Sequence, residues 1–117
     1  MHETSLMENM LSLAAEHLAP YRVERVNAIT LKIGRLANVL PQALDFAFEA
    51  ITREGLFAGA GLILITVPYT ARCRDCATVY ESVDLPPLCP VCGGHGAEIL
   101  SGTEVYLDSI DFEEREV

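Results

Sequence analysis

Two pairs of cysteines constrain this chain more than any other feature. They lie in the segments CRDC, Cys73 to Cys76, and CPVC, Cys89 to Cys92, with twelve residues between the pairs. In a Cys-x-x-Cys turn both sulfurs point to one place, and two such turns supply four thiolates to a tetrahedral ion. The spacing between the pairs is slightly shorter than is usual for this pattern but of the same kind.

Three interpretations compete for these cysteines. Disulfides are rare in a reducing compartment, and a redox-active pair would leave the other pair unexplained. A tetrathiolate metal site accounts for both pairs. Zinc is the favoured metal and iron is the alternative, because such turns also build rubredoxin-like centres. Four sulfur ligands leave no open position, so we expect a closed, structural site that supplies much of the folding energy of a small lobe.

The composition excludes several classes of function. The 117 residues include 17 acidic and 8 basic ones, for a formal net charge of -9. This balance argues against nucleic-acid binding, which depends on Lys and Arg, and suits solubility or a partner with a basic face. No apolar run is long enough to span a membrane, and the N-terminus lacks the pattern of a secretory signal. We therefore expect a cytoplasmic protein without a membrane span.

Hydrophobic periodicity predicts two helices outside the cysteine region. The first spans residues 5–19, where Ser5 and Glu8 match a capping box. Its apolar stripe is expected to include Leu13, and His17 is expected at the surface. The second helix begins near Asn38 or Pro41 and ends at Arg53. Its expected core residues are Leu44, Phe46, Phe48 and Ile51.

Three strands are also predicted, over residues 23–33, 62–67 and 104–112. Leu62–Val67 is apolar except for Thr66, which favours a central strand. The last strand must pair with the earlier ones to enter a sheet, so the cysteine region is an insertion between two strands. We therefore expect an α+β fold with a small mixed sheet and two helices, plus an inserted zinc-ribbon lobe. The predicted α/β domain is discontinuous, covering residues 1–69 and 99–117, and the ribbon covers residues 70–98.

The opening residues, MHETSL, offer a second metal site of a different kind. The α-amine of Met1, the amide nitrogen of His2 and the imidazole Nδ1 of His2 can close two fused chelate rings on one ion. The amide or the carboxylate of Glu3 can supply a further donor. A planar nitrogen set of this kind suits Ni(II) or Cu(II). The motif is weak when taken alone, because any chain can begin with these residues.

Together these motifs resemble those of the HypA/HybF family, the nickel metallochaperones of hydrogenase maturation. The similarity runs from end to end, through MHETSL, LKIGRLANV with the following ALDFAFE, the two cysteine pairs with CPxCG, and SGTEVYLDSID. The resemblance implies that His2 is the principal Ni(II) ligand, with Glu3 as its neighbour. It also implies that Cys73, Cys76, Cys89 and Cys92 bind structural Zn(II).

The resemblance further implies delivery of Ni(II) to the large subunit of [NiFe]-hydrogenase, together with the GTPase HypB, and in some members to urease. The chain departs from the family pattern at Ala37, Leu56 and Ala58. His95 follows the second cysteine pair, where some relatives carry a histidine that affects metal binding. A plain surface histidine is the alternative interpretation of His95.

No motif in the chain assembles a nucleophile, a base and an oxyanion donor, so we expect a carrier rather than an enzyme. Two other functions compete with the nickel carrier. One is a zinc-ribbon adaptor without a nickel function. The other is a rubredoxin-like electron carrier, which would be red where a zinc tetrathiolate is colourless.

Overall fold

The computed structural model of the protein describes residues 3–116, which form two compact units. Unit 1 takes in the described residues of Met1–Lys32, Val39–Ile65 and Tyr106–Val117. Unit 2 takes in Ile33–Asn38 and Thr66–Val105, which is more of the chain than the 70–98 expected for the ribbon. No helix of the described part is long and apolar enough to cross a membrane.

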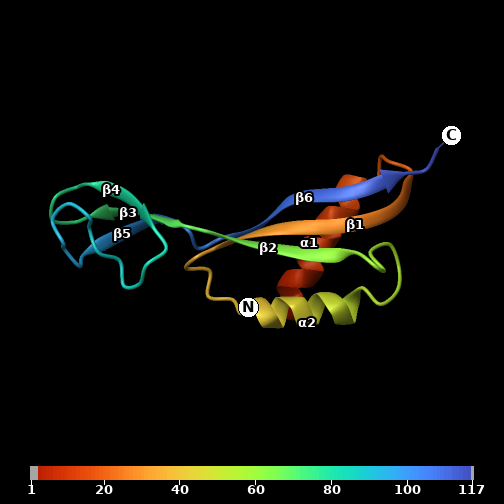
Figure 1. Ribbon diagram of the computed structural model, residues 1–117, viewed down its shortest axis with the longest axis horizontal. Helices are drawn as coiled ribbons and strands as arrows, with labels where there is room; N and C mark the ends of the chain where they lie inside the picture. Colours follow the sequence, from red (N-terminus) through yellow and green to blue (C-terminus); the bar gives the residue numbers. More distant parts are fainter. Residues whose placement is uncertain (1–2, 117) are drawn as a thin grey trace. The chain divides into compact units, whose positions relative to one another are not determined.

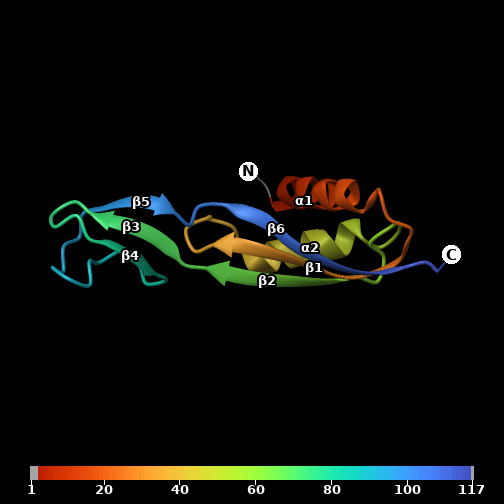
Figure 2. The same ribbon diagram turned by 90° about the horizontal axis from the view of Figure 1, so that it is seen from above.

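Unit 1 is built from a three-stranded sheet in the order β2-β1-β6 and two helices (Figures 1 and 2). The helices are α1 (Glu3–Leu18) and α2 (Pro41–Ile51), and the strands are β1 (Val23–Gly34), β2 (Gly61–Val67) and β6 (Val105–Glu114). The arrows of β1 and β2 point the same way, as expected for strands joined through a helix, and β6 runs against them (Figure 2). The sheet is therefore mixed, as predicted.

The core of unit 1 lies between the sheet and the two helices. Within unit 1, strand β1 alternates buried Ile29 and Leu31 with half-buried Thr30 and Lys32, so only one of its faces is fully covered. Helix α1 buries a broad stripe, and α2 packs against it. The buried residues of the two helices are Leu6, Met7, Met10, Leu11, Ala14, Leu18, Leu44, Ala47 and Phe48.

Four details of unit 1 differ from the prediction. Phe46 is 74% exposed, whereas Phe48 is buried; Leu13 and Ile51 also lie partly outside the core. Residues two apart on a helix point to nearly opposite sides, so Phe46 and Phe48 cannot both face the sheet. Strand β2 is an edge strand rather than a central one.

The prediction of a capping box at Ser5 is also wrong. Helix α1 already includes Glu3 and Thr4, so Ser5 has a helical backbone and cannot act as the N-cap. By contrast, Pro41 does occupy the first turn of α2, as expected. His17 is exposed in the last turn of α1, as predicted.

Unit 2 is an antiparallel sheet in the order β4-β3-β5. Its strands are β3 (Tyr69–Cys73), β4 (Val79–Ser82) and β5 (Ala97–Ser101), and all three fall between β2 and β6 in the chain, as an insertion requires. The small core consists of Tyr69, Ala71, Cys73, Tyr80 and Cys89. Two of these five residues are cysteines, so the metal-site residues also form part of the apolar core.

The segment Ile33–Asn38 belongs to unit 2 although it precedes the rest of that unit in the chain. The amide of Gly34 donates to the carbonyl of Glu104 (2.8 Å), and the amide of Leu36 donates to the carbonyl of Gly102 (2.8 Å). A Cβ atom on Gly34 would lie 2.2 Å from the Gly102 carbonyl oxygen, so only glycine permits this approach. The side chain of Leu36 packs against the small core.

Candidate metal centre

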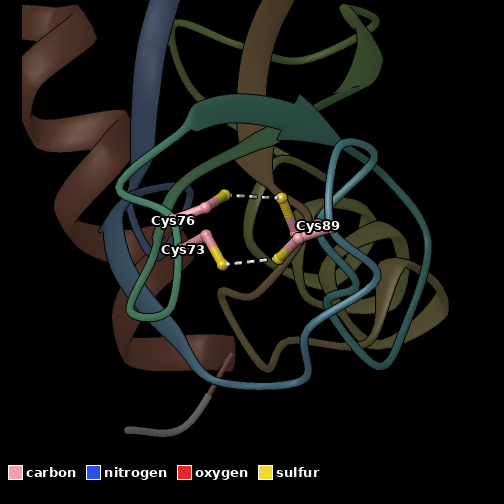
Figure 3. A group of neighbouring side chains, drawn as sticks. Cys73, Cys76 and Cys89 are labelled. Carbon is pink, nitrogen blue, oxygen red and sulfur yellow. Dashed lines mark hydrogen bonds between the residues drawn. The ribbon is translucent and has the colours of Figure 1, made fainter.

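The sulfur atoms of Cys73, Cys76, Cys89 and Cys92 all lie within 4.8 Å of one another. The Sγ atoms of Cys73 and Cys92 are 3.4 Å apart, and those of Cys76 and Cys89 are 3.5 Å apart (Figure 3). Among the described residues this is the only such group of potential metal ligands. The structure thus brings the four predicted cysteines together as a zinc-ribbon-like site.

The spacing of the sulfurs fits a tetrahedral ion. A metal with bonds to sulfur of about 2.3 Å requires sulfurs about 3.8 Å apart, close to the two short distances. Both distances are far longer than a disulfide bond of about 2.05 Å, and the four cysteines are free. No histidine or carboxylate joins the group, so the donor set is soft and uniform, which suits zinc or iron.

Two turns of the same design hold the cysteines. In the first, the amide of Ala77 donates to the carbonyl of Cys73 (2.9 Å); in the second, the amide of Gly93 donates to the carbonyl of Cys89 (2.9 Å). Ala77 and Gly93 each lie four residues after the first cysteine of their turn, and both have positive φ, 65° and 74°. Glycine at position 93 adopts a positive φ readily, whereas nothing in the sequence marks Ala77 for one.

Backbone amides and one hydroxyl surround the sulfurs. The amides of Val91 and Gly94 donate to the sulfurs of Cys89 and Cys92, each at 3.4 Å. Hydrogen bonds from the hydroxyl and amide of Thr78 lower the pKa of Cys76 to about 6, so this sulfur is mostly thiolate at neutral pH. The thiolate form is the one that binds metal. Thr78 is a contributor that the sequence analysis missed.

The other exposed thiol behaves differently. The Gly94 amide lowers the pKa of Cys92, but the neighbouring sulfurs of Cys73 and Cys76 outweigh it and raise the pKa to about 12. Deprotonating Cys92 beside the other sulfurs is therefore unfavourable in the absence of a cation. A divalent ion would offset this repulsion, and four thiolates around zinc would leave a net charge of about −2.

Tyr80 lies in the same buried cluster as Cys73 and Cys89. Its hydroxyl is buried and has no hydrogen-bond partner among the described residues. Burial, followed by the nearby Tyr69 and thiols, raises the pKa of Tyr80, so the phenol keeps its proton. A neutral donor beside the sulfurs is compatible with a centre that becomes negatively charged when it binds metal.

The turn geometry predicts opposite effects for two substitutions. With Zn(II) as the test ion, Ala77→Gly should tighten metal binding by about fivefold, because it removes a cost of roughly 1 kcal/mol for alanine at positive φ. Gly93→Ala should weaken binding by a similar factor for the same reason. Competition with a chromophoric chelator would measure both. Gly96→Ala is the control, because Gly96 has no positive φ and its added Cβ would make only ordinary contacts; an equal change in all three variants would contradict this account.

The predicted nickel site falls partly outside the described part of the chain. Met1 and His2 are not among residues 3–116, and Glu3 is the first described residue of α1. His95 is exposed in the loop after the second cysteine pair and does not belong to the group of metal ligands. The structure thus brings together the four cysteines and leaves His95 as a surface residue of unit 2.

Comparison with known proteins agrees with this arrangement over nearly the whole chain. A family model described as "Hydrogenase/urease nickel incorporation, metallochaperone, hypA" matches residues 1–112. The hydrogenase maturation factor HypA of Dechloromonas aromatica (strain RCB) is 38% identical over 113 residues, covering 97% of this chain and 100% of the relative. HypA of Desulfitobacterium hafniense (strain DSM 10664 / DCB-2) is 38% identical over 114 residues, with the same coverage.

Two solved structures share the fold. The solution structure of the nickel metallochaperone HypA from Helicobacter pylori superposes with a TM-score of 0.69 at 23% identity, covering 98% of this chain and 100% of the other. A second solution structure of a HypA protein gives a TM-score of 0.64 at 25% identity and covers 97% of each chain.

Proposed function

Because this chain belongs to the HypA family of metallochaperones, which incorporate nickel during hydrogenase maturation, we propose that it binds Ni(II) at its N-terminus and delivers it to the large subunit of [NiFe]-hydrogenase. The ligands are the α-amine of Met1, the amide and imidazole of His2, and Glu3. The observation that carries this proposal is the family match, which begins at residue 1 and so includes these residues. The family is one of carriers and not of catalysts.

The start of α1 favours a nickel site that also releases its ion. The first four amides of a helix have no intrahelical acceptor, so the amide of Glu3 can serve a metal without costing a hydrogen bond of α1. The same end of the helix carries the positive end of the macrodipole, which disfavours a cation by a few tenths to about 1 kcal/mol. This cost weakens binding and assists transfer.

The cysteine group is proposed to hold structural Zn(II). Its support is the set of four sulfurs within 4.8 Å of one another in a unit with a very small apolar core. Zinc bound there closes the two turns and stabilises unit 2. Because all four ligands come from the protein, no position remains for a substrate.

The proposed partners are the GTPase HypB and the hydrogenase large subunit, with urease maturation as a further destination. The description of the family model, which covers both hydrogenase and urease, supports the two destinations. We place this work in the cytoplasm, where the four free thiols stay reduced.

The chelate at Met1 predicts that lengthening the chain by two residues matters at one end only. Two glycines added before Met1 should weaken Ni(II) binding at least about tenfold, because they remove the α-amine from the ring that includes His2. Two are needed because a single glycine would make His2 the third residue, where the amine, two amides and the imidazole would close a new planar chelate. Isothermal titration with Ni(II) would measure this on protein with Met1 as its first residue and on the extended form. Two glycines added after Val117 are the control. Equal affinity in all three proteins would favour the zinc-ribbon adaptor without a nickel function.

A further inference from the structure

Strand β6 forms an open edge of the unit 1 sheet. In the order β2-β1-β6, it pairs with β1 on one side, and no strand of residues 3–116 pairs with the other (Figure 1). An edge strand presents a row of free backbone N–H and C=O groups, and an extended peptide can bind there as an additional strand. At ten residues, β6 is long enough to hold a peptide of ordinary strand length.

A groove of about 370 Å³ runs between this strand and the end of α1. The strand contributes half-buried Leu107, Ile110 and Phe112. The aromatic rings of Tyr21 and Phe112 meet at one end with centroids 5.2 Å apart. The remaining lining residues are His17, Leu18, Asp108 and Ser109. Apolar side chains that are only half covered thus lie next to free backbone groups, the two features that a peptide site of this kind requires.

The strand and the residues that follow it are strongly acidic. Residues 104–117 contain six acidic residues and one arginine, which gives −5 of the total charge of −9. Asp108 forms an ion pair with Lys32, and Glu113 with Arg25. Asp111 and Glu114 are exposed and form no ion pair among the described residues. The edge therefore carries negative charge that the chain itself leaves partly uncompensated.

The negative charge of this edge determines which kind of strand can bind there. A second copy of β6 would bring a strand of the same negative charge against the first, which is unfavourable. A segment with lysines or arginines would instead be attracted. We propose that the edge of β6 binds an extended segment of a partner protein in which basic and apolar residues alternate, as a fourth strand of the sheet. This inference does not depend on nickel, so it can fail or hold independently of the proposed function.

Hydrogen exchange would locate such binding on the intact wild-type protein. The probe is a fluorescein-labelled peptide of alternating valine and lysine, about eight residues long; the same peptide with glutamate in place of lysine is its control. We expect the lysine peptide to slow amide exchange within residues 105–114 and the glutamate peptide to have no effect. Protection at the β2 edge, or protection nowhere, would overturn the proposal. The latter would leave the acidic residues with a purely protective role against aggregation.

Charge reversal tests whether the acidic residues of β6 attract the basic peptide. The double variant Asp111→Lys/Glu114→Lys should bind the lysine peptide about tenfold more weakly in fluorescence anisotropy, since each exposed charge contributes roughly threefold. The control is Asp45→Lys/Glu49→Lys, which makes the same change of net charge at two exposed positions on α2. We expect less than about a twofold change in the control. Equal weakening in both variants would reduce the effect to overall charge and refute a site at β6.

The oligomeric state provides the last test. Analytical ultracentrifugation should find no concentration-dependent association through β6 in the wild-type protein. If the wild-type protein dimerised and the dimer dissociated on Asp111→Lys/Glu114→Lys, the edge would be an interface between two copies of this chain, and the proposed basic partner would be wrong.

Discussion

Replacing Cys73 by serine is expected to release zinc and unfold unit 2, while unit 1 stays folded. Cys73 ends strand β3, is 1% exposed, and is both a sulfur donor and a member of the small core. Structural zinc sites of this kind supply roughly 10 kcal/mol or more of folding free energy. The apolar core of five residues is too small to replace that contribution.

The measurements are zinc content and a two-dimensional amide NMR spectrum. We expect the zinc content to fall close to zero, the unit 2 resonances to collapse to unfolded positions, and the resonances of α1 and β1 to keep their dispersion. Arg74→Ala is the matched control, because Arg74 is the exposed neighbour of Cys73 and contributes no sulfur. Loss of structure in both units, or full zinc retention in the serine variant, would contradict the separate roles given to the two units.

The second large effect is expected from His2→Ala, which should lower the affinity for Ni(II) by at least about a hundredfold. The imidazole closes one of the two fused rings, and its loss leaves an amine and an amide that hold Ni(II) poorly. The zinc content should not change, because the cysteine group contains no histidine. Titration calorimetry and metal analysis on the same samples would separate the two sites.

Two other histidines provide controls of the same chemistry. His17 lies exposed at the end of α1 and His95 lies exposed in unit 2. His17→Ala should leave nickel affinity unchanged, and a decrease with His95→Ala would show that the loop after the second cysteine pair takes part. If His2→Ala bound Ni(II) as tightly as the wild-type protein, the assignment of the nickel site to the N-terminus would be wrong.

The sequence predicted those features that depend on local chemistry. Two Cys-x-x-Cys turns have few ways to arrange four sulfurs, so the clustering of the four cysteines followed from the spacing alone. Glycine accommodates the positive φ at position 93 by its residue type, whereas the same geometry at Ala77 is imposed by the turn and has no mark in the sequence. The order of helices and strands likewise required the ribbon to be an insertion.

The features that depend on distant contacts were not predicted correctly. Strand β2 is apolar except for Thr66 yet lies at an edge, because its place is set by pairing with β1 and not by its own composition. Ser5 and Glu8 satisfy the pattern of a capping box, but the helix begins earlier in the chain. Phe46 could have been placed correctly from sequence, since its distance of two residues from Phe48 puts the two rings on opposite sides of a helix.

The short segment Ile33–Asn38 has a consequence for attempts to divide the protein. It comprises the last two residues of β1 and part of the link to α2, yet the side chain of Leu36 packs against the core of unit 2 and Gly34 lies against Gly102. A fragment that ends at the borders of the cysteine region would lack this segment. A deletion of the cysteine region would leave the segment without its contacts and exposed to solvent. The ribbon is thus not a detachable module. Transferring it to another protein would also require the six residues Ile33–Asn38, which precede it in the chain.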